Sequence, residues 1–171
     1  MVEALNGGGR ADAQQMLGEL WCYASLTRAA TKAAEAEARE FGAGTWFLDE
    51  KPLRALRSMM PGWMVRMGEI LKLLGGHNLL ATPEAAAFAQ PELGKKLERY
   101  LPGARGVSAQ DRAKLFRMAW DFVGSALGSR TELYERFYLA SATRTLSIHH
   151  MLAQREQAWT AVPDFMQRSG S

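Results

Sequence analysis

Apolar residues recur every three or four positions along most of this chain, the spacing of one face of an α-helix. The first such stretch runs from Ala11 to about Phe41 and stops just before two closely spaced glycines. Its apolar face carries Leu17, Leu20 and Trp21, and its second half is rich in alanine, glutamate and lysine, which are strong helix formers. We therefore predict one long helix here.

Prolines mark the start of the next two predicted helices. Proline is tolerated in the first turn of a helix because the N–H that it lacks has no partner there. We predict a short helix over 52–59 and a second helix from Pro61 to Leu74. The second helix ends at Gly75 and Gly76, because paired glycines favour a helix C-terminus.

The rest of the chain has the pattern of shorter helices joined by turns. Ser108 is the predicted N-cap of a helix that continues to a break at Gly128 and Ser129. Residues 79–82 are predicted as a loop. The other predicted helices cover 83–88, 91–101, 130–141 and 143–158, with a last turn near Phe165. No alternation of apolar and polar residues is long enough to predict a strand.

These elements predict an all-α fold, an antiparallel helical bundle with short connections. We expect a flexible N-terminus over 1–10, because this end is rich in glycine and lacks the helical pattern. One helical domain is expected over 11–167, followed by a flexible tail over 168–171.

Composition narrows the classes of partner. Of the 171 residues, 47% are hydrophobic and 23% charged, enough for a packed core and a solvated surface. The net charge of +3 comes from scattered basic residues, so we expect no nucleic-acid partner. No stretch approaches the ~18 apolar residues of a membrane span, and the start has no signal-peptide pattern. We expect no membrane partner and a cytoplasmic location.

The usual motifs for catalysis and metal binding are absent from the sequence. It has no G-x-S-x-G nucleophile motif and no glycine-rich phosphate loop after a strand. The single cysteine, Cys22, excludes an internal disulfide and a multi-cysteine metal site, and we predict a buried thiol on a helix. His149 and His150 are adjacent, so on a helix they point about 100° apart and do not suit one metal ion. We assign no catalytic and no metal-binding residue.

Two segments nevertheless stand out. In the first, Gly75 and Gly76 end a helix and a polar loop follows, which permits close approach of a ligand to the backbone. A plain helix C-cap with a turn is the favoured interpretation from these residues alone.

The second segment, residues 115–138, interleaves aromatic and charged residues. Its charged members are Asp121, Arg130, Glu132, Glu135 and Arg136. We predict buried ion pairs between helices here. The two arginines also suit a phosphate group, because a guanidinium fork matches its oxygens.

Both segments resemble one known family, the large components of 4-hydroxyphenylacetate 3-hydroxylases. Residues 115–121 (LFRMAWD), a Gly-Ser step and residues 130–137 (RTELYERF) are similar to the family's C-terminal signature. The Gly-Gly pair followed by residues 81–83 (ATP) is similar to a family loop. The similarity covers roughly Leu17 to Met166, and its order and spacing make it specific.

The resemblance implies a fold similar to the C-terminal helical domain of acyl-CoA dehydrogenases. Full enzymes of the family take FADH2 from a separate flavin reductase, react it with O2 and hydroxylate a phenol ortho to its hydroxyl group. They are homo-oligomers. The resemblance also implies a set of cofactor-binding residues, which are Gly75, Gly76, His77, Asn78, Arg130, Tyr138, Leu139, Ala140 and Ser141.

The chain also departs from the family. His77 and Asn78 stand where the family has small residues, and residues 140–142 read Ala-Ser-Ala where the family tends to have Gly-Asp-Pro. The domains that carry catalysis in full-length members are missing, so we expect a fragment of such an enzyme.

Two further interpretations stay open. One is a non-catalytic helical module for oligomerisation or assembly that derives from this family, and the other is an unrelated cytosolic helical bundle. The related 4-hydroxybutyryl-CoA dehydratases need an iron–sulfur cluster, for which one cysteine is too few.

Overall fold

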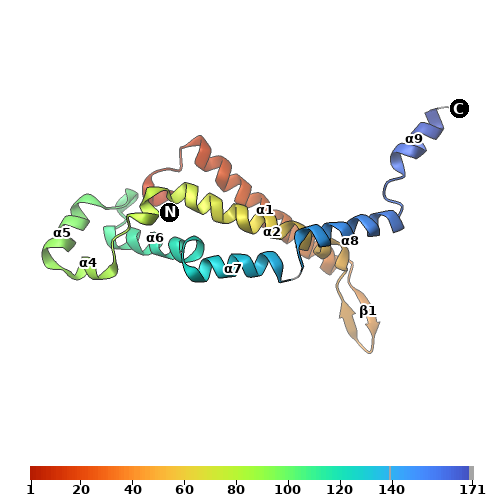
Figure 1. Cartoon of the computed structure of the whole chain (residues 1–171), viewed down its shortest axis with the longest axis horizontal. Helices are drawn as coiled ribbons and strands as arrows, with labels where there is room; N and C mark the ends of the chain where they lie inside the picture. The colour runs from red at the N-terminus through yellow and green to blue at the C-terminus, as the bar shows by residue number, and fades with distance from the viewer. Residues whose placement is uncertain (139, 170–171) are drawn as a thin grey trace. The chain divides into compact units, whose positions relative to one another are not determined.

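The computed structural model describes residues 1–138 and 140–169 (Figure 1). The chain divides into two compact units. Unit 1 consists of Met1–Arg28 and Trp63–Tyr134, and unit 2 consists of Ala29–Gly62 and the residues from Glu135 onward. Helices α1 (Ala11–Ala36), α2 (Glu50–Gly75) and α7 (Ala126–Phe137) each cross a boundary between the units.

Unit 1 is built around helix α6 (Ala109–Val123), which packs against three shorter helices. These are α3 (His77–Leu80), α4 (Ala85–Ala89) and α5 (Pro91–Tyr100). Two 3-10 turns, η1 (Glu3–Leu5) and η2 (Ala104–Gly106), pack against each other. The all-α prediction is confirmed for the described residues apart from one small hairpin.

The core of unit 1 lies along one face of α6. Phe116, Ala119 and Val123 recur at helical spacing and form a buried cluster with Leu79 of α3, and Phe116 is only 1% exposed. Met1, Leu5 and Leu71 pack against this cluster. The sequence predicts a flexible N-terminus over 1–10, but Val2 and Ala4 are buried there and η1 follows the first residues.

The start of α6 is fixed as the sequence predicts. The Ser108 Oγ accepts a hydrogen bond of 3.0 Å from the Asp111 amide. The Glu98 carboxylate accepts two more first-turn amides, those of Ala109 at 3.0 Å and Gln110 at 3.3 Å. Hydrogen bonds from Ser108 and Lys114 hold the pKa of the Asp111 carboxyl below its ordinary value.

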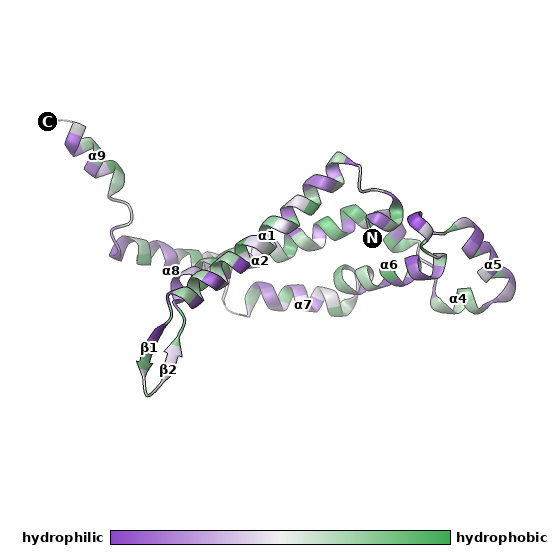
Figure 2. Cartoon of the chain, turned by 180° about the vertical axis from the view of Figure 1, so that it is seen from behind, coloured by the Kyte–Doolittle hydropathy of each residue, from purple (hydrophilic) through white to green (hydrophobic). Residues whose placement is uncertain are grey.

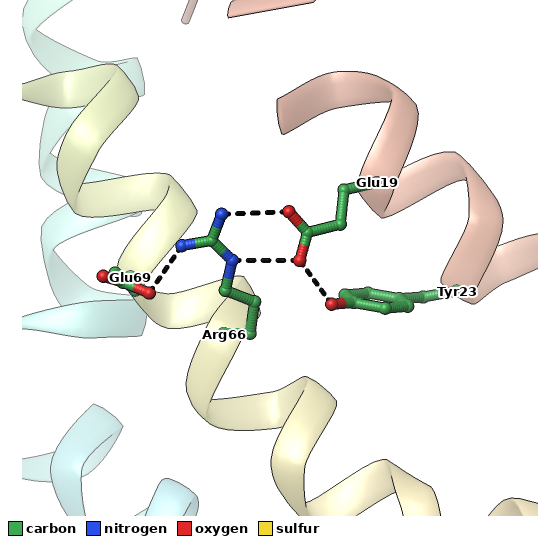
Figure 3. A network of polar contacts seen from close by, with 4 residues as sticks. All are labelled: Glu19, Tyr23, Arg66 and Glu69. Atoms are coloured by element: carbon green, nitrogen blue, oxygen red, sulfur yellow. Dashed lines mark hydrogen bonds and ion pairs between the residues drawn. The ribbon is translucent and has the colours of Figure 1, made fainter. Parts of the chain in front are cut away.

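Within unit 1, α1 and α2 are joined by the polar network of Figure 3. The Arg66 guanidinium donates to both oxygens of Glu19, at 2.9 Å and 3.0 Å, and to Glu69 at 2.6 Å. Tyr23 donates to Glu19, and its ring stacks on Trp63 with centroids 4.8 Å apart. Since Glu19 pairs with Arg66 and Tyr23 with Trp63, the two helices run antiparallel here.

Unit 2 contains a two-stranded hairpin that the sequence did not reveal. Strands β1 (Arg39–Gly42) and β2 (Thr45–Phe47) pair antiparallel, so α1 ends at Ala36 and not near Phe41. The strands are too short for a clear alternation, and the glycines that we assigned to a helix end form the turn instead. The rings of Phe41 and Phe47 meet edge to face at 5.2 Å.

Helix α2 runs unbroken from Glu50 to Gly75 with Pro61 inside it, so the prediction of two helices is wrong. Proline removes one backbone hydrogen bond and disfavours a helix interior, but packing of an amphipathic helix can exceed that cost. The Gly62 that follows lies at the boundary between the units.

Other boundaries differ from the predictions in smaller ways. The predicted loop over 79–82 begins inside α3. The break between α6 and α7 falls at Gly124 and Ser125, and not at Gly128. A Cβ on Gly128 would lie 2.5 Å from the Phe122 carbonyl oxygen, so glycine there allows the first turn of α7 to lie close to the end of α6. The last two described helices are α8 (Ala142–Arg155) and α9 (Ala161–Ser169).

Candidate functional site

The first predicted cofactor-binding residues, 75–78, lie in unit 1 at the junction of α2 and α3. Gly75 is buried, and a Cβ added there would lie 2.5 Å from the Leu79 Cγ. Gly76 has φ +50°, a positive value that glycine adopts more readily than residues with a Cβ. Both glycines therefore have roles in packing and in the turn.

His77 and Asn78 follow in α3. His77 is exposed, whereas Asn78 accepts a hydrogen bond from the Arg112 guanidinium through its side-chain oxygen. Arg112 also donates to the Leu101 carbonyl at 3.2 Å. Asn78 thus holds α3 to α6, which accords with a structural role for this segment.

Three of the five charged residues for which the sequence predicts buried ion pairs lie on the surface. Asp121, Arg130 and Glu135 are exposed, so the prediction is wrong for these three. Arg130 lines a shallow depression of unit 1 with Leu133 and Tyr134. Charged side chains on this segment keep their hydration, which a buried pair would lose.

The remaining predicted cofactor-binding residues belong to unit 2. Tyr138 and Ala140 both line a cavity of about 260 Å³, Ser141 caps the start of α8, and Leu139 lies outside the described residues. The other walls come mainly from α2, through Leu53, Leu56, Met60 and Pro61. We call this the apolar cavity.

Ala140 has an unusual backbone. Its φ is +90°, a region that alanine rarely adopts because the Cβ crowds the backbone. Glycine, which the resemblance leads us to expect at this position, adopts that conformation at little cost.

A second cavity of unit 2, of about 360 Å³, adjoins the first and shares Arg57, Ala140 and Thr145 with it. We call it the arginine cavity. Its lining includes Arg54 and Arg57 of α2 and Arg144 and His149 of α8, with no carboxylate among the lining residues. Glu135 lines the apolar cavity, and Glu50 pairs with Arg54 at the edge of the arginine cavity.

The hydroxyl groups of the arginine cavity are already engaged. Ser58 donates to the Arg54 carbonyl at 3.2 Å, and Thr145 donates to the Ala142 carbonyl at 2.9 Å. The first turn of α8 also lines this cavity, through Arg144 and Thr145. The Ser141 Oγ caps this turn by accepting a hydrogen bond from the Arg144 amide at 3.4 Å. A helix start carries partial positive charge, so it adds to the field of the arginines.

The sequence analysis missed the arginine cavity. Arg54 and Arg57 stand three residues apart on one helix, and Arg144 and His149 stand on another about 90 positions later. The i, i+3 spacing of the first pair was a local signal for a shared face. Only the fold brings the second helix to it.

The comparisons with known proteins agree with the family resemblance. The model of the HpaB family, the 4-hydroxyphenylacetate 3-hydroxylase C-terminal domain, matches residues 1–167. The chain belongs to this family. The match includes both segments that carry the resemblance.

Two curated relatives are oxygenase components of 4-hydroxyphenylacetate 3-monooxygenase. That of Thermus thermophilus is 32% identical over 99% of this chain and 35% of its own length. That of a Geobacillus species is 31% identical over 84% of this chain and 29% of its own length. The chain therefore spans about a third of the length of the relatives that it matches.

Solved structures show the same domain. A crystal structure of the oxygenase component complexed with FAD and 4-hydroxyphenylacetate matches with a TM-score of 0.89 and 32% identity, over 98% of this chain and 35% of the other. An archaeal 4-hydroxybutyryl-CoA dehydratase matches with a TM-score of 0.77 and 13% identity, over 95% and 33%. The second likeness shows a shared fold alone.

The structure also bears on the remaining predictions for this HpaB-family domain. Cys22 is exposed on α1, so the prediction of a buried thiol is wrong. Among residues 1–138 and 140–169, no group of three or more histidines, cysteines, aspartates or glutamates is placed to hold a metal ion. The search of these same residues for membrane-spanning helices found none.

Proposed function

We propose that this chain is the C-terminal domain of an oxygenase component in a two-component, FADH2-dependent aromatic monooxygenase. Such an enzyme hydroxylates a phenol ortho to its hydroxyl group and receives FADH2 from a separate flavin reductase. The observation that supports this proposal most directly is the family match over residues 1–167. The chain is also 32% identical to an oxygenase component whose crystal structure contains FAD and 4-hydroxyphenylacetate. When bound, the reduced flavin supplies the electrons for oxygen activation.

Within the domain, we assign flavin contact first to Tyr138, Ala140 and Ser141. Tyr138 and Ala140 line a cavity with apolar walls, which suits a planar aromatic ring, and the adjoining cavity offers guanidinium groups to phosphate. The donor chemistry therefore fits a flavin nucleotide. The segment 75–78 and Arg130 stay secondary candidates, because Gly75 and Asn78 already have internal contacts. No residue of the chain is proposed as a catalytic acid, base or nucleophile.

The test is a titration of the purified chain with FAD in air and with FADH2 under anaerobic conditions, followed by flavin fluorescence and absorbance. We expect saturable binding that Tyr138→Ala weakens about tenfold, because an aromatic contact is lost. Tyr100→Ala is the matched control, since Tyr100 is 68% exposed on α5 of unit 1. Absence of saturable flavin binding, or equal weakening by both variants, would contradict flavin contact at Tyr138.

A role in assembly has its own support. Large apolar side chains of the hairpin and of α9 are exposed, as Phe41 (83%), Val162 (71%) and Phe165 (63%) illustrate. Figure 2 shows hydrophobic residues on both of these elements. Exposed apolar patches typically mark contact surfaces. We propose that the domain forms homo-oligomers in the cytoplasm. Light scattering after size-exclusion chromatography tests the oligomeric state. A monomer at all concentrations would contradict homo-oligomerisation.

A further inference from the structure

Unit 1 has a cavity of its own, and none of the residues assigned to flavin contact lines it. Its volume is about 320 Å³, and its walls come from α2, α6 and α7. Apolar side chains line it from all three helices, namely Met64, Met118, Phe122 and Leu127. We call it the methionine cavity. Small-molecule sites span roughly 300–1,000 Å³, so a cavity near the lower end of that range suits a ligand with a single ring.

The wall formed by α2 is open at Gly68. This residue lies one turn after Met64 on the same face of the helix, and a Cβ added to it would meet no atom within 4 Å. A flat ring can therefore approach the helix backbone there more closely than it could approach a larger residue. The thioethers of Met64 and Met118 adapt their shape and make favourable contacts with rings. Together these walls favour an aromatic group.

Two opposite charges line the same cavity. The Lys72 ammonium comes from α2, one turn after Gly68, and the Asp121 carboxylate comes from α6. Both residues are exposed, and among the described residues none forms an ion pair with either side chain. Glu132 also lines the cavity, but it already has an interaction within the chain. One cation and one anion can thus receive the opposite charges of a ligand.

We propose that the methionine cavity binds an aromatic α-amino acid. Its ring lies against the apolar walls, its carboxylate faces Lys72 and its ammonium group faces Asp121. A zwitterion meets both charges at once, whereas an aromatic amine or an aromatic carboxylate meets only one of them. Contact of the ring with the apolar walls supplies most of the affinity, because charge pairs at exposed side chains contribute little. This binding does not depend on the proposed flavin contact.

The first experiment compares three ligands that share one ring. Isothermal titration calorimetry of the full chain is run with L-phenylalanine, with phenethylamine, which lacks the carboxylate, and with 3-phenylpropanoate, which lacks the ammonium group. We expect L-phenylalanine to bind about two- to fivefold more tightly than either analogue, the range for an exposed charge pair.

Two variants assign each charge to its partner. Lys72→Gln is expected to remove the advantage of L-phenylalanine over phenethylamine, and Asp121→Asn its advantage over 3-phenylpropanoate. Lys96→Gln is the matched control, because Lys96 is an exposed lysine on α5 of the same unit. Circular dichroism checks that each variant is folded.

Gly68→Leu tests the cavity itself. The leucine side chain has open space at this position and occupies the cavity, so we expect it to weaken binding of L-phenylalanine at least about tenfold. Gly18→Leu is the matched control, because Gly18 is exposed on α1 and a Cβ there also meets nothing within 4 Å.

Methyl NMR of ¹³C-labelled methionines locates the ligand independently of its affinity. The ring current of L-phenylalanine is expected to shift the methyl resonances of Met64 and Met118. The methyl resonance of Met166, on α9 in unit 2, is expected to stay unchanged.

Each result supports or overturns the proposal. Binding of phenethylamine or of 3-phenylpropanoate as tight as that of L-phenylalanine would overturn recognition of a zwitterion. Binding that Gly68→Leu leaves unchanged, or that shifts neither the Met64 nor the Met118 methyl, would overturn the placement in the methionine cavity. Absence of saturable binding of L-phenylalanine at millimolar concentration would overturn the proposal as a whole.

Discussion

Single residues of this domain have consequences that their chemical type alone does not give. Ala140 is the clearest example, because its φ of +90° is costly for any residue with a Cβ. The sequence showed that alanine stands where the family tends to have glycine. Only the structure shows that this alanine has a positive φ.

We predict that Ala140→Gly increases the free energy of unfolding by about 1 kcal/mol. Relief of the left-handed strain exceeds the entropy that glycine adds to the unfolded chain. Urea denaturation followed by circular dichroism measures the change. Ala33→Gly in α1 of unit 2 is the control, and it is expected to decrease stability by about 0.5–1 kcal/mol because that alanine is in a helix. A decrease for both variants would show that Ala140 is not strained.

Two glycines of α2 give opposite expectations for the same substitution. A Cβ at Gly75 meets the buried Leu79 side chain at 2.5 Å, whereas a Cβ at Gly68 meets nothing within 4 Å. We predict that Gly75→Ala destabilises by about 1 kcal/mol, since overpacking outweighs the gain in helix propensity, and that Gly68→Ala stabilises by up to about 1 kcal/mol. Thermal melts of both variants test this, and changes of the same sign would contradict the packing described for Gly75.

At the scale of elements, the sequence predicted what local chemistry controls. The Ser108 cap and the start of the helix that follows it are found where the pattern placed them. The core face is not, because Phe116 is buried whereas Met118 and Phe122, which the helical spacing also suggests for the core, are exposed. The hairpin and the unbroken α2 were missed, because β1 and β2 are short and because packing overrode the local preference of Pro61. The arginine cavity was missed for a related reason, since its walls come from helices distant in the sequence.

The contact between α1 and α2 is expected to depend on pH. The hydrogen bonds from Arg66 and Tyr23 hold the pKa of the Glu19 carboxyl below its ordinary value. A carboxyl with a lowered pKa in the folded state binds fewer protons than in the unfolded state. The ionised Glu19 carboxyl therefore stabilises the fold above its unfolded-state pKa of about 4.3. This stabilisation is lost as the pH falls through the lower pKa of the folded state.

We predict that Glu19→Gln lowers stability at pH 7 and flattens its decline between about pH 5 and pH 2. Thermal melts over this range measure the effect, and part of the decline remains because the Asp111 pKa is lowered as well. Tyr23→Phe is a partial control, since it removes one hydrogen bond to Glu19 and keeps Arg66 in place. An unchanged pH profile in Glu19→Gln would show that the network of Figure 3 does not persist in solution.

At the scale of the whole molecule, the resemblance identified the family before the structure did. It rested on residues 115–121, on residues 130–137 and on the Ala-Thr-Pro segment at 81–83. The sequence gives the order of these segments along the chain, but it does not show where they lie in the fold. The division into two units was not predicted, because it runs through helices α1, α2 and α7 and not through a linker.

Those shared helices have a consequence for how the domain can be inherited. Neither unit is one continuous stretch of chain, so no single cut or splice yields either of them whole. A recombination event that moves one unit must leave half-helices behind in the other. The two units are therefore inherited together as one stretch of chain.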